Sequence, residues 1–109
     1  MAYDDKLAGR IRKRLAHRKD IVEKKMFGGL AFMLNGNMCC GIVKDTLMVR
    51  VPPGQYEMML KEPHARPMDF TGRPLRGFVY VDPKGLRTDG ALEKWLKRAL
   101  AFASSLPAK

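Results

Sequence analysis

Cysteine, acidic side chains and long apolar runs are all scarce in this sequence of 109 residues. Two cysteines are too few for a disulfide-rich scaffold, and 46% hydrophobic residues can form a core without crosslinks. The longest clean apolar run, Leu30 to Leu34, is far shorter than the roughly 18 residues that a membrane-spanning helix needs. We therefore expect a single soluble domain over residues 1–109 that has no contact with a membrane.

The N-terminus lacks the pattern of a secretory signal. Asp4 and Asp5 stand where such a signal needs basic residues, and basic side chains interrupt each apolar segment as far as Lys25. Secretion is therefore disfavoured, and we expect a reducing cytoplasm. Cys39 and Cys40 are adjacent in a strand-like run, so we expect their side chains to point to opposite faces of a sheet without bonding each other.

Positive charge is abundant. The chain has 21 Lys and Arg against 11 Asp and Glu, which gives a net charge of +10 and favours anionic partners. Residues 6–18 have helical periodicity, with a stripe of Leu7, Ala8, Ile11 and Leu15. On the opposite face the same period places a basic ridge of Lys6, Arg10, Lys13, Arg14 and His17. Arg18 extends this ridge at the end of the helix.

The middle of the chain has the pattern of an antiparallel meander. Apolar runs at residues 30–34, 38–43 and 47–51 predict three strands. Asn35-Gly36 predicts a tight hairpin turn between the first two, because both central residues of a type I′ turn need positive φ. A second turn is expected at Lys44-Asp45. We expect Gly28-Gly29 to bend or bulge the first strand.

The second half predicts a helix, a hairpin and a helix. Pro53 can begin a short helix that continues to Leu60, and a hairpin is expected between residues 68–70 and 78–81. Thr88 or Asp89 can cap the last helix. Its predicted buried stripe is Leu92, Trp95, Leu96, Ala99, Ala103 and Leu106. The predicted order is helix, three strands, helix, two strands, helix, which is an α+β domain with five strands.

Several segments, in this order along the chain, resemble the N-terminal domain of the TfoX/Sxy family, named for regulators of bacterial natural competence. They are Met26-Phe27-Gly28-Gly29-Leu30, Leu47-Met48-Val49-Arg50-Val51-Pro52 with Tyr56, Ala65-Arg66-Pro67-Met68-Asp69-Phe70-Thr71-Gly72-Arg73-Pro74, Gly77-Phe78-Val79-Tyr80-Val81, Gly85-Leu86-Arg87, Trp95 and the ending Ala99 to Pro107. The resemblance implies a secretion-chaperone-like α+β fold with no catalytic residues and no cofactor.

The resemblance also implies partners. Competence regulators of this family usually carry a second, helical C-terminal domain and act with a cyclic-AMP receptor protein at promoters. Because this chain ends at Lys109, directly after the predicted last helix, we expect a stand-alone N-terminal domain. A protein partner such as a transcription factor is expected, and fold analogy favours a homodimer.

Two groups of residues are candidates for contact with anions or a partner. The first is the basic ridge, with Lys6, Arg10, Lys13, Arg14 and Arg18, which could neutralise phosphates or stand as an ordinary solvated helix face. The second is the segment with Arg66, Phe70, Arg73 and Arg76. Its guanidinium groups and ring could stack on bases or bind a carboxylate, or Phe70 and Met68 could simply pack inward.

Catalytic and metal-binding patterns are weak. Cys39, Cys40, His64 and His17 lack the spacing of a structural zinc site, so we interpret the cysteines as core residues and expect no metal. Gly28-Gly29 lacks the spacing of a phosphate-binding loop. The first hypothesis is therefore a non-enzymatic regulatory or adaptor domain. The alternatives are a nucleic-acid-binding module and, third, a small enzyme that would need a polar pocket with shifted pKa values.

Overall fold

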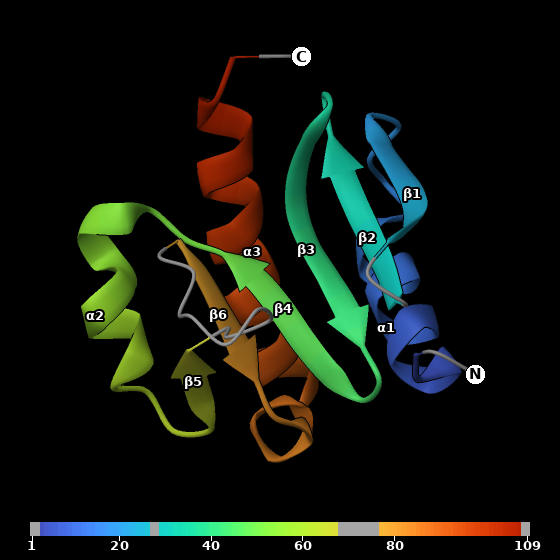
Figure 1. Cartoon of the computed structure of the whole chain (residues 1–109). Helices are drawn as coiled ribbons and strands as arrows, with labels where there is room; N and C mark the ends of the chain where they lie inside the picture. Colours follow the sequence, from blue (N-terminus) through green and yellow to red (C-terminus); the bar gives the residue numbers. More distant parts are fainter. Residues whose placement is uncertain (1–2, 27–28, 68–76, 108–109) are drawn as a thin grey trace.

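A computed structural model describes residues 3–26, 29–67 and 77–107 of the chain (Figure 1). The elements in chain order are α1 (Asp5–Leu15), β1 (Ile21–Met26), β2 (Gly29–Leu34), β3 (Asn37–Val43), β4 (Thr46–Arg50), the 3₁₀ turn η1 (Pro53–Gln55), α2 (Tyr56–Leu60), β5 (Ala65–Pro67), β6 (Phe78–Val81), the 3₁₀ turn η2 (Pro83–Leu86) and α3 (Asp89–Ser105). The α+β class predicted from the sequence is confirmed.

The six strands form one antiparallel sheet in the order β1-β2-β3-β4-β6-β5. Helices α1 and α3 lie behind the sheet in the view of Figure 1, and α2 lies beside β6 and β5. Phe32, Cys40, Val49 and Val79 are in register across four strands and all belong to the core that the helices cover. This row of buried side chains is the centre of the core.

The other face of the sheet has a smaller apolar cluster. Ala31, Gly41, Met48 and Tyr80 are in register across the same strands and alternate with the core-facing row. Met48 and Tyr80 are both buried there, with Met38 and Phe78 packed against them. The sheet therefore carries apolar side chains on both faces, and the larger share faces the helices.

Helix α1 forms where its apolar periodicity predicts it. The Asp4 carboxylate caps its start by accepting hydrogen bonds from the backbone N–H groups of Lys6 and Leu7. The buried side chains of the helix are the predicted stripe of Leu7, Ala8, Ile11 and Leu15. The helix ends at Leu15, three residues before the predicted end, and the chain then enters β1 at Ile21.

The predicted meander is confirmed in β2, β3 and β4. Asn35 and Gly36 have φ values of 52° and 83°, the positive values that the expected hairpin turn requires. The prediction about Gly28-Gly29 is wrong where it can be judged. Gly29 begins β2, and the register irregularity falls between Phe32 and Met33 instead. Gly28 lies outside the described residues.

The predicted order of five strands is wrong, because the structure has a sixth strand, β1, before the meander. The sequence of β1 has apolar residues only at its two ends, Ile21 and Val22 at the start and Met26 at the finish, and its exposed residues include Glu23, Lys24 and Lys25. An edge strand needs less apolar surface than a central one, so its sequence gives a weak periodic signal. None of the five predicted strands covers residues 21–26.

The second half follows the prediction with one shift. Helix α2 follows Pro53 as expected, and α3 is capped by Thr88, whose hydroxyl oxygen accepts a hydrogen bond from the backbone N–H of Ala91. β6 pairs with β4 on one side and, on the other side, with β5 at Ala65–Pro67. The predicted partner, residues 68–70, lies outside the described residues. Along α3 the predicted stripe is buried from Leu92 to Ala103, while Leu106 is only half-buried at the C-cap.

Within the described ranges, no helix has the length and apolar character needed to cross a membrane.

Candidate functional site

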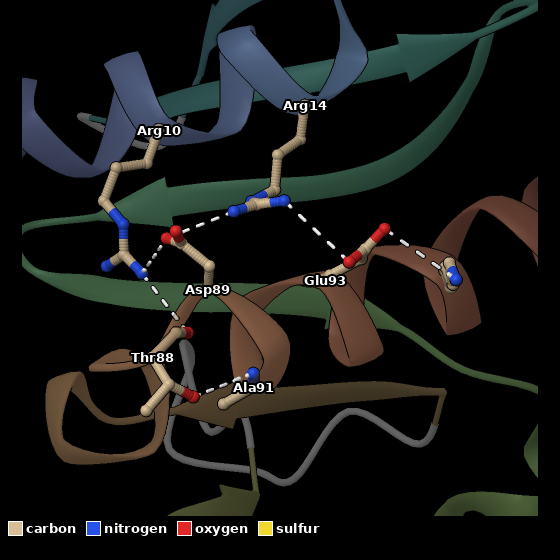
Figure 2. A network of polar contacts seen from close by, with 7 residues as sticks. Arg10, Arg14, Thr88, Asp89, Ala91 and Glu93 are labelled. Atoms are coloured by element: carbon tan, nitrogen blue, oxygen red, sulfur yellow. Dashed lines mark hydrogen bonds and ion pairs between the residues drawn. The ribbon is translucent and has the colours of Figure 1, made fainter.

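The basic residues of α1 fall into two groups. Arg10 and Arg14 point toward the start of α3, as Figure 2 shows. Asp89 Oδ1 lies 3.1 Å from Arg14 Nη2 and 3.6 Å from Arg10 Nη2, and Arg14 Nη1 lies 3.9 Å from Glu93 Oε2. Arg10 also donates a hydrogen bond of 3.4 Å to the carbonyl oxygen of Thr88. These two arginines therefore link α1 to α3.

The charge of this link is balanced inside the molecule. The hydrogen bond from Arg14, followed by its positive charge and that of Arg10, holds the pKa of Asp89 below its usual value. Asp89 also lies in the first turn of α3, where the positive end of the helix dipole favours an acidic side chain. Arg10 and Arg14 thus have acidic partners and are less available to a phosphate than the sequence alone indicated.

The second group of α1 side chains faces solvent. Lys6 and Lys13 are exposed, and neither forms an ion pair within the described part of the chain. Arg18, which follows the helix, binds the Asp20 carboxylate through Nε and Nη2 at 3.2 and 3.1 Å. This hydrogen bonding lowers the pKa of Asp20. The predicted basic ridge is therefore divided between ion-paired arginines and exposed lysines.

A further ion pair joins α1 to the first strand. Arg12 donates from Nε and Nη2 to the two carboxylate oxygens of Glu23, each at 2.8 Å. Such two-pronged pairs are the strongest arginine–carboxylate geometry. Asp20 and Glu23 thus each bind an arginine that precedes them in the chain. The arrangement fixes the position of β1 beside α1.

Of the second predicted group, the structure describes Arg66 alone. Its guanidinium carbon lies 4.9 Å from the centroid of the Tyr80 ring, and its Nε donates a hydrogen bond of 2.8 Å to Asp82. The predictions for Phe70, Arg73 and Arg76 fall outside the described residues. Arg66 thus contacts Tyr80 and Asp82 and no described residue of the basic ridge, and contact with a partner stays a prediction for both groups.

The two cysteines do not point to opposite faces. Phe32 pairs with Cys40 while Met33 pairs with Met38, so Cys39 is the extra residue of a β-bulge in β3. Both thiols consequently lie in the helix-covered core, unpaired by a disulfide. A hydrogen bond with Cys39, together with burial, raises the pKa of Cys40. Among the described residues, no group of three His, Cys, Asp or Glu side chains could hold a metal ion.

Glu62, which sequence reasoning missed, is a half-buried carboxylate that binds two cations. It follows α2 and accepts hydrogen bonds from Lys94 at 2.8 Å and from Arg98, both on α3. Burial alone would raise its pKa, but the hydrogen bonds from Lys94 and Arg98 outweigh that effect and the pKa is lowered. The Arg98 guanidinium carbon also lies 4.9 Å from the Trp95 ring centroid. This cluster fastens α2 to α3.

The edge strand β1 is the other feature that the sequence did not indicate. It ends the strand order on one side, so no strand of the described chain pairs with its outer edge. Val22 is 56% exposed, and Lys24 and Lys25 are exposed with it. At the opposite end of the sheet, β5 has only three residues and contains Pro67. Of the two edges, β1 therefore offers the longer row of backbone hydrogen-bonding groups to another chain.

Comparison with known proteins gives one match. No curated protein and no solved structure matches the chain significantly. A family model described as the TfoX N-terminal domain matches residues 13–103. The matched segment begins within α1, ends within α3 and includes all six strands of the sheet described above. This chain therefore belongs to the TfoX N-terminal domain family.

Proposed function

We propose that the chain is a non-enzymatic regulatory or adaptor domain that acts by binding another protein. The observation that carries the proposal is the edge strand β1, six residues long, with Val22 more than half exposed. Exposed edges bind partner strands through backbone hydrogen bonds, and the exposed side chains select the partner. The lysines of β1 favour a partner strand with acidic side chains.

Membership of the TfoX N-terminal domain family supports a regulatory role, and a transcription factor of the cytoplasm is the first partner to test. The charge clusters of the structure are compatible with this proposal. Asp20, Glu62 and Asp89 have lowered pKa values because arginine or lysine binds each of them. Such carboxylates stay ionised at neutral pH and hold elements together. A carboxylate that acts as a general acid or base at pH 7 needs a raised pKa instead.

Affinity capture from the cells that make the protein tests the proposal. The tagged chain is incubated with lysate in two arms, with and without nuclease, and the retained proteins are compared by mass spectrometry. The proposal expects the same protein partner in both arms, and complex formation when the purified partner is mixed with the chain at micromolar concentration. Loss of every partner after nuclease treatment would contradict direct protein contact.

A homodimer is part of the same proposal, because an edge strand can also pair with a second copy of itself. Sedimentation velocity over a range of protein concentrations measures the oligomeric state. A single species with the mass of one chain at all concentrations would remove self-pairing and leave contact with a different protein.

The net charge of +10 favours one alternative, a nucleic-acid-binding module. In that case Lys6 and Lys13 would contribute most on α1, because Arg10 and Arg14 already bind acidic side chains. Duplex affinity measured across salt concentrations tests it. A nucleic-acid binder must lose affinity steeply as salt rises, and an affinity that is absent or insensitive to salt would eliminate this alternative.

A further inference from the structure

Arg50, at the end of β4, is in cation–π contact with two aromatic rings from different elements. Its guanidinium carbon is 5.9 Å from the centroid of Phe78 on β6 and 5.6 Å from that of Phe102 on α3. The pairing of β4 with β3 ends at Val49 and Cys40, whereas Arg50 still pairs with Phe78. Arg50 therefore lies past the end of that ladder, where its side chain can reach α3.

The hydrogen-bond donors of Arg50 have no acceptor within the described part of the chain, although the side chain is only partly exposed. The same part of the chain contains no buried side-chain nitrogen that lacks a partner, so these donors reach solvent. Cation–π contacts with the two rings hold the guanidinium near Phe78 and Phe102 before any ligand arrives. Arg50 is thus a cation that has no counter-ion among the described residues.

A groove of about 300 Å³ lies next to Arg50, between η1 and α2 on one side and the C-terminal half of α3 on the other. Phe102 lines this groove and is also one of the two rings in cation–π contact with Arg50. Met59 and Ala101 add apolar surface, and Gln55 supplies a polar group. This volume is at the low end for small-molecule pockets and can hold one or two aliphatic side chains.

The described residues supply no counter-ion for Arg50, and a carboxylate of another protein can take that place. Arg98, which also lines the groove, is already bound to Glu62, so its charge is balanced. In the described ranges Arg50 has no such partner. A planar guanidinium binds a carboxylate through two parallel hydrogen bonds. The apolar groove beside it favours a short aliphatic side chain over a solvated phosphate chain, which would need several cations in a row.

We propose that Arg50 and this groove bind a peptide segment of a partner protein in which a carboxylate side chain is followed directly by leucine or a similar aliphatic residue. The carboxylate contacts Arg50, and the aliphatic side chain packs against Phe102 and Met59. The groove is a different surface from the edge of β1. The proposal therefore does not depend on strand pairing at β1, and either one can fail alone.

Titration of the isotope-labelled chain with synthetic peptides tests the proposal by NMR. The probe is Gly-Gly-Glu-Leu-Leu-Gly-Gly, and its matched control has glutamine in place of the glutamate. We expect saturable shifts of the backbone amides of Gln55 and Ala101 and of the Arg50 side-chain Nε–H. The glutamine peptide should bind about tenfold more weakly, because it lacks the charged hydrogen bonds.

Two variants separate the site from the fold. Arg50→Gln should weaken binding of the glutamate peptide by about tenfold or more. Ala101→Trp should block the groove, and because Ala101 is exposed the change leaves the core intact. Arg87→Gln, which removes an exposed arginine at the end of η2 that belongs to neither candidate group, is the matched control and should leave binding unchanged. An unchanged amide spectrum away from the groove verifies that each variant is folded.

Three results would overturn the proposal. The first is an absence of shifts at the groove up to millimolar peptide. The second is equal binding of the glutamate and glutamine peptides. The third is binding of inorganic phosphate or of a short single-stranded oligonucleotide to Arg50 as tightly as the glutamate peptide, which would make the site a general anion site.

Discussion

Gly29 and Ile42 lie so close across β2 and β3 that a Cβ atom on Gly29 would stand 2.0 Å from the Ile42 carbonyl oxygen. The clash is with backbone, which cannot rotate away as a side chain can. We predict that Gly29→Ala lowers the free energy of unfolding by about 1–3 kcal/mol. Urea unfolding followed by the fluorescence of Trp95, the single tryptophan, measures the change.

Gly9 is the matched control for this substitution. It lies inside α1, and a Cβ atom there would meet nothing within 4 Å. Alanine is the better helix former, so Gly9→Ala should raise the free energy of unfolding by about 0.5–1 kcal/mol. If both substitutions shifted stability in the same direction, the close approach of β2 and β3 would not be the cause.

Asp89 should make stability depend on pH in acid. Its pKa is lowered in the folded state, so its ion pairs with Arg14 and Arg10 stabilise the fold above the unfolded pKa of about 3.9. This stabilisation is lost as pH falls through the folded value. Asp89→Asn should therefore lower the Tm at neutral pH and leave it nearly unchanged in strong acid.

Asp5→Asn provides the comparison for Asp89, because Asp5 also lies in the first turn of a helix and is exposed. Among the described residues it has no ion-pair partner, so its variant should change the Tm less at neutral pH. High salt should reduce the effect of Asp89→Asn, since the pair is exposed to solvent. An effect of Asp89→Asn that is the same at all pH values would contradict the assigned ion pairs.

Glu62→Gln should loosen the junction of α2 with α3. The variant keeps the size of the side chain and removes the charge that Lys94 and Arg98 bind. We expect a loss of about 1 kcal/mol in the free energy of unfolding at neutral pH. Because the pKa of Glu62 is lowered, the wild type should lose this contribution as pH falls through that value, and its stability should then converge on that of the variant. Two curves that stay parallel would refute the assignment.

The two thiols should be inert in the native protein. Cys39 and Cys40 are fully buried, and the raised pKa of Cys40 disfavours its reactive thiolate. A chromogenic disulfide reagent at mildly alkaline pH should label neither thiol until urea unfolds the chain, and then both. Rapid labelling of the native protein would mean that the cysteines do not lie in the core.

The sequence predicts this fold best where its signals are local. Asn35-Gly36 specifies a turn by its own backbone preferences, and Thr88 specifies a helix start by its own hydroxyl group. The apolar stripe of α1 was likewise identified residue by residue. Strand β1 was missed because an edge strand that carries Glu23, Lys24 and Lys25 has little apolar periodicity to detect.

The candidate site could be predicted only in part, because it depends on contacts between residues far apart in the sequence. The period of α1 placed Arg10 and Arg14 on its basic face but carried no information about Asp89, which is 75 residues beyond Arg14. Arg50 is one basic residue at the end of an apolar strand in the sequence. Its ring partners come from β6 and α3 and become visible only in the folded chain. The bulge that brings Cys39 and Cys40 to one face is equally absent from simple strand alternation.

The most direct test of binding through the edge of β1 compares two matched variants in the capture experiment with nuclease. Val22 and Met58 are the two large apolar side chains that stand exposed in the described part of the chain, at 56% and 61%. Val22→Glu adds an acidic charge to the edge strand that should repel an acidic partner strand, whereas Met58→Glu adds the same charge on α2. We predict that Val22→Glu loses the partner and that Met58→Glu retains it, with both variants folded. Full retention by Val22→Glu would contradict the account.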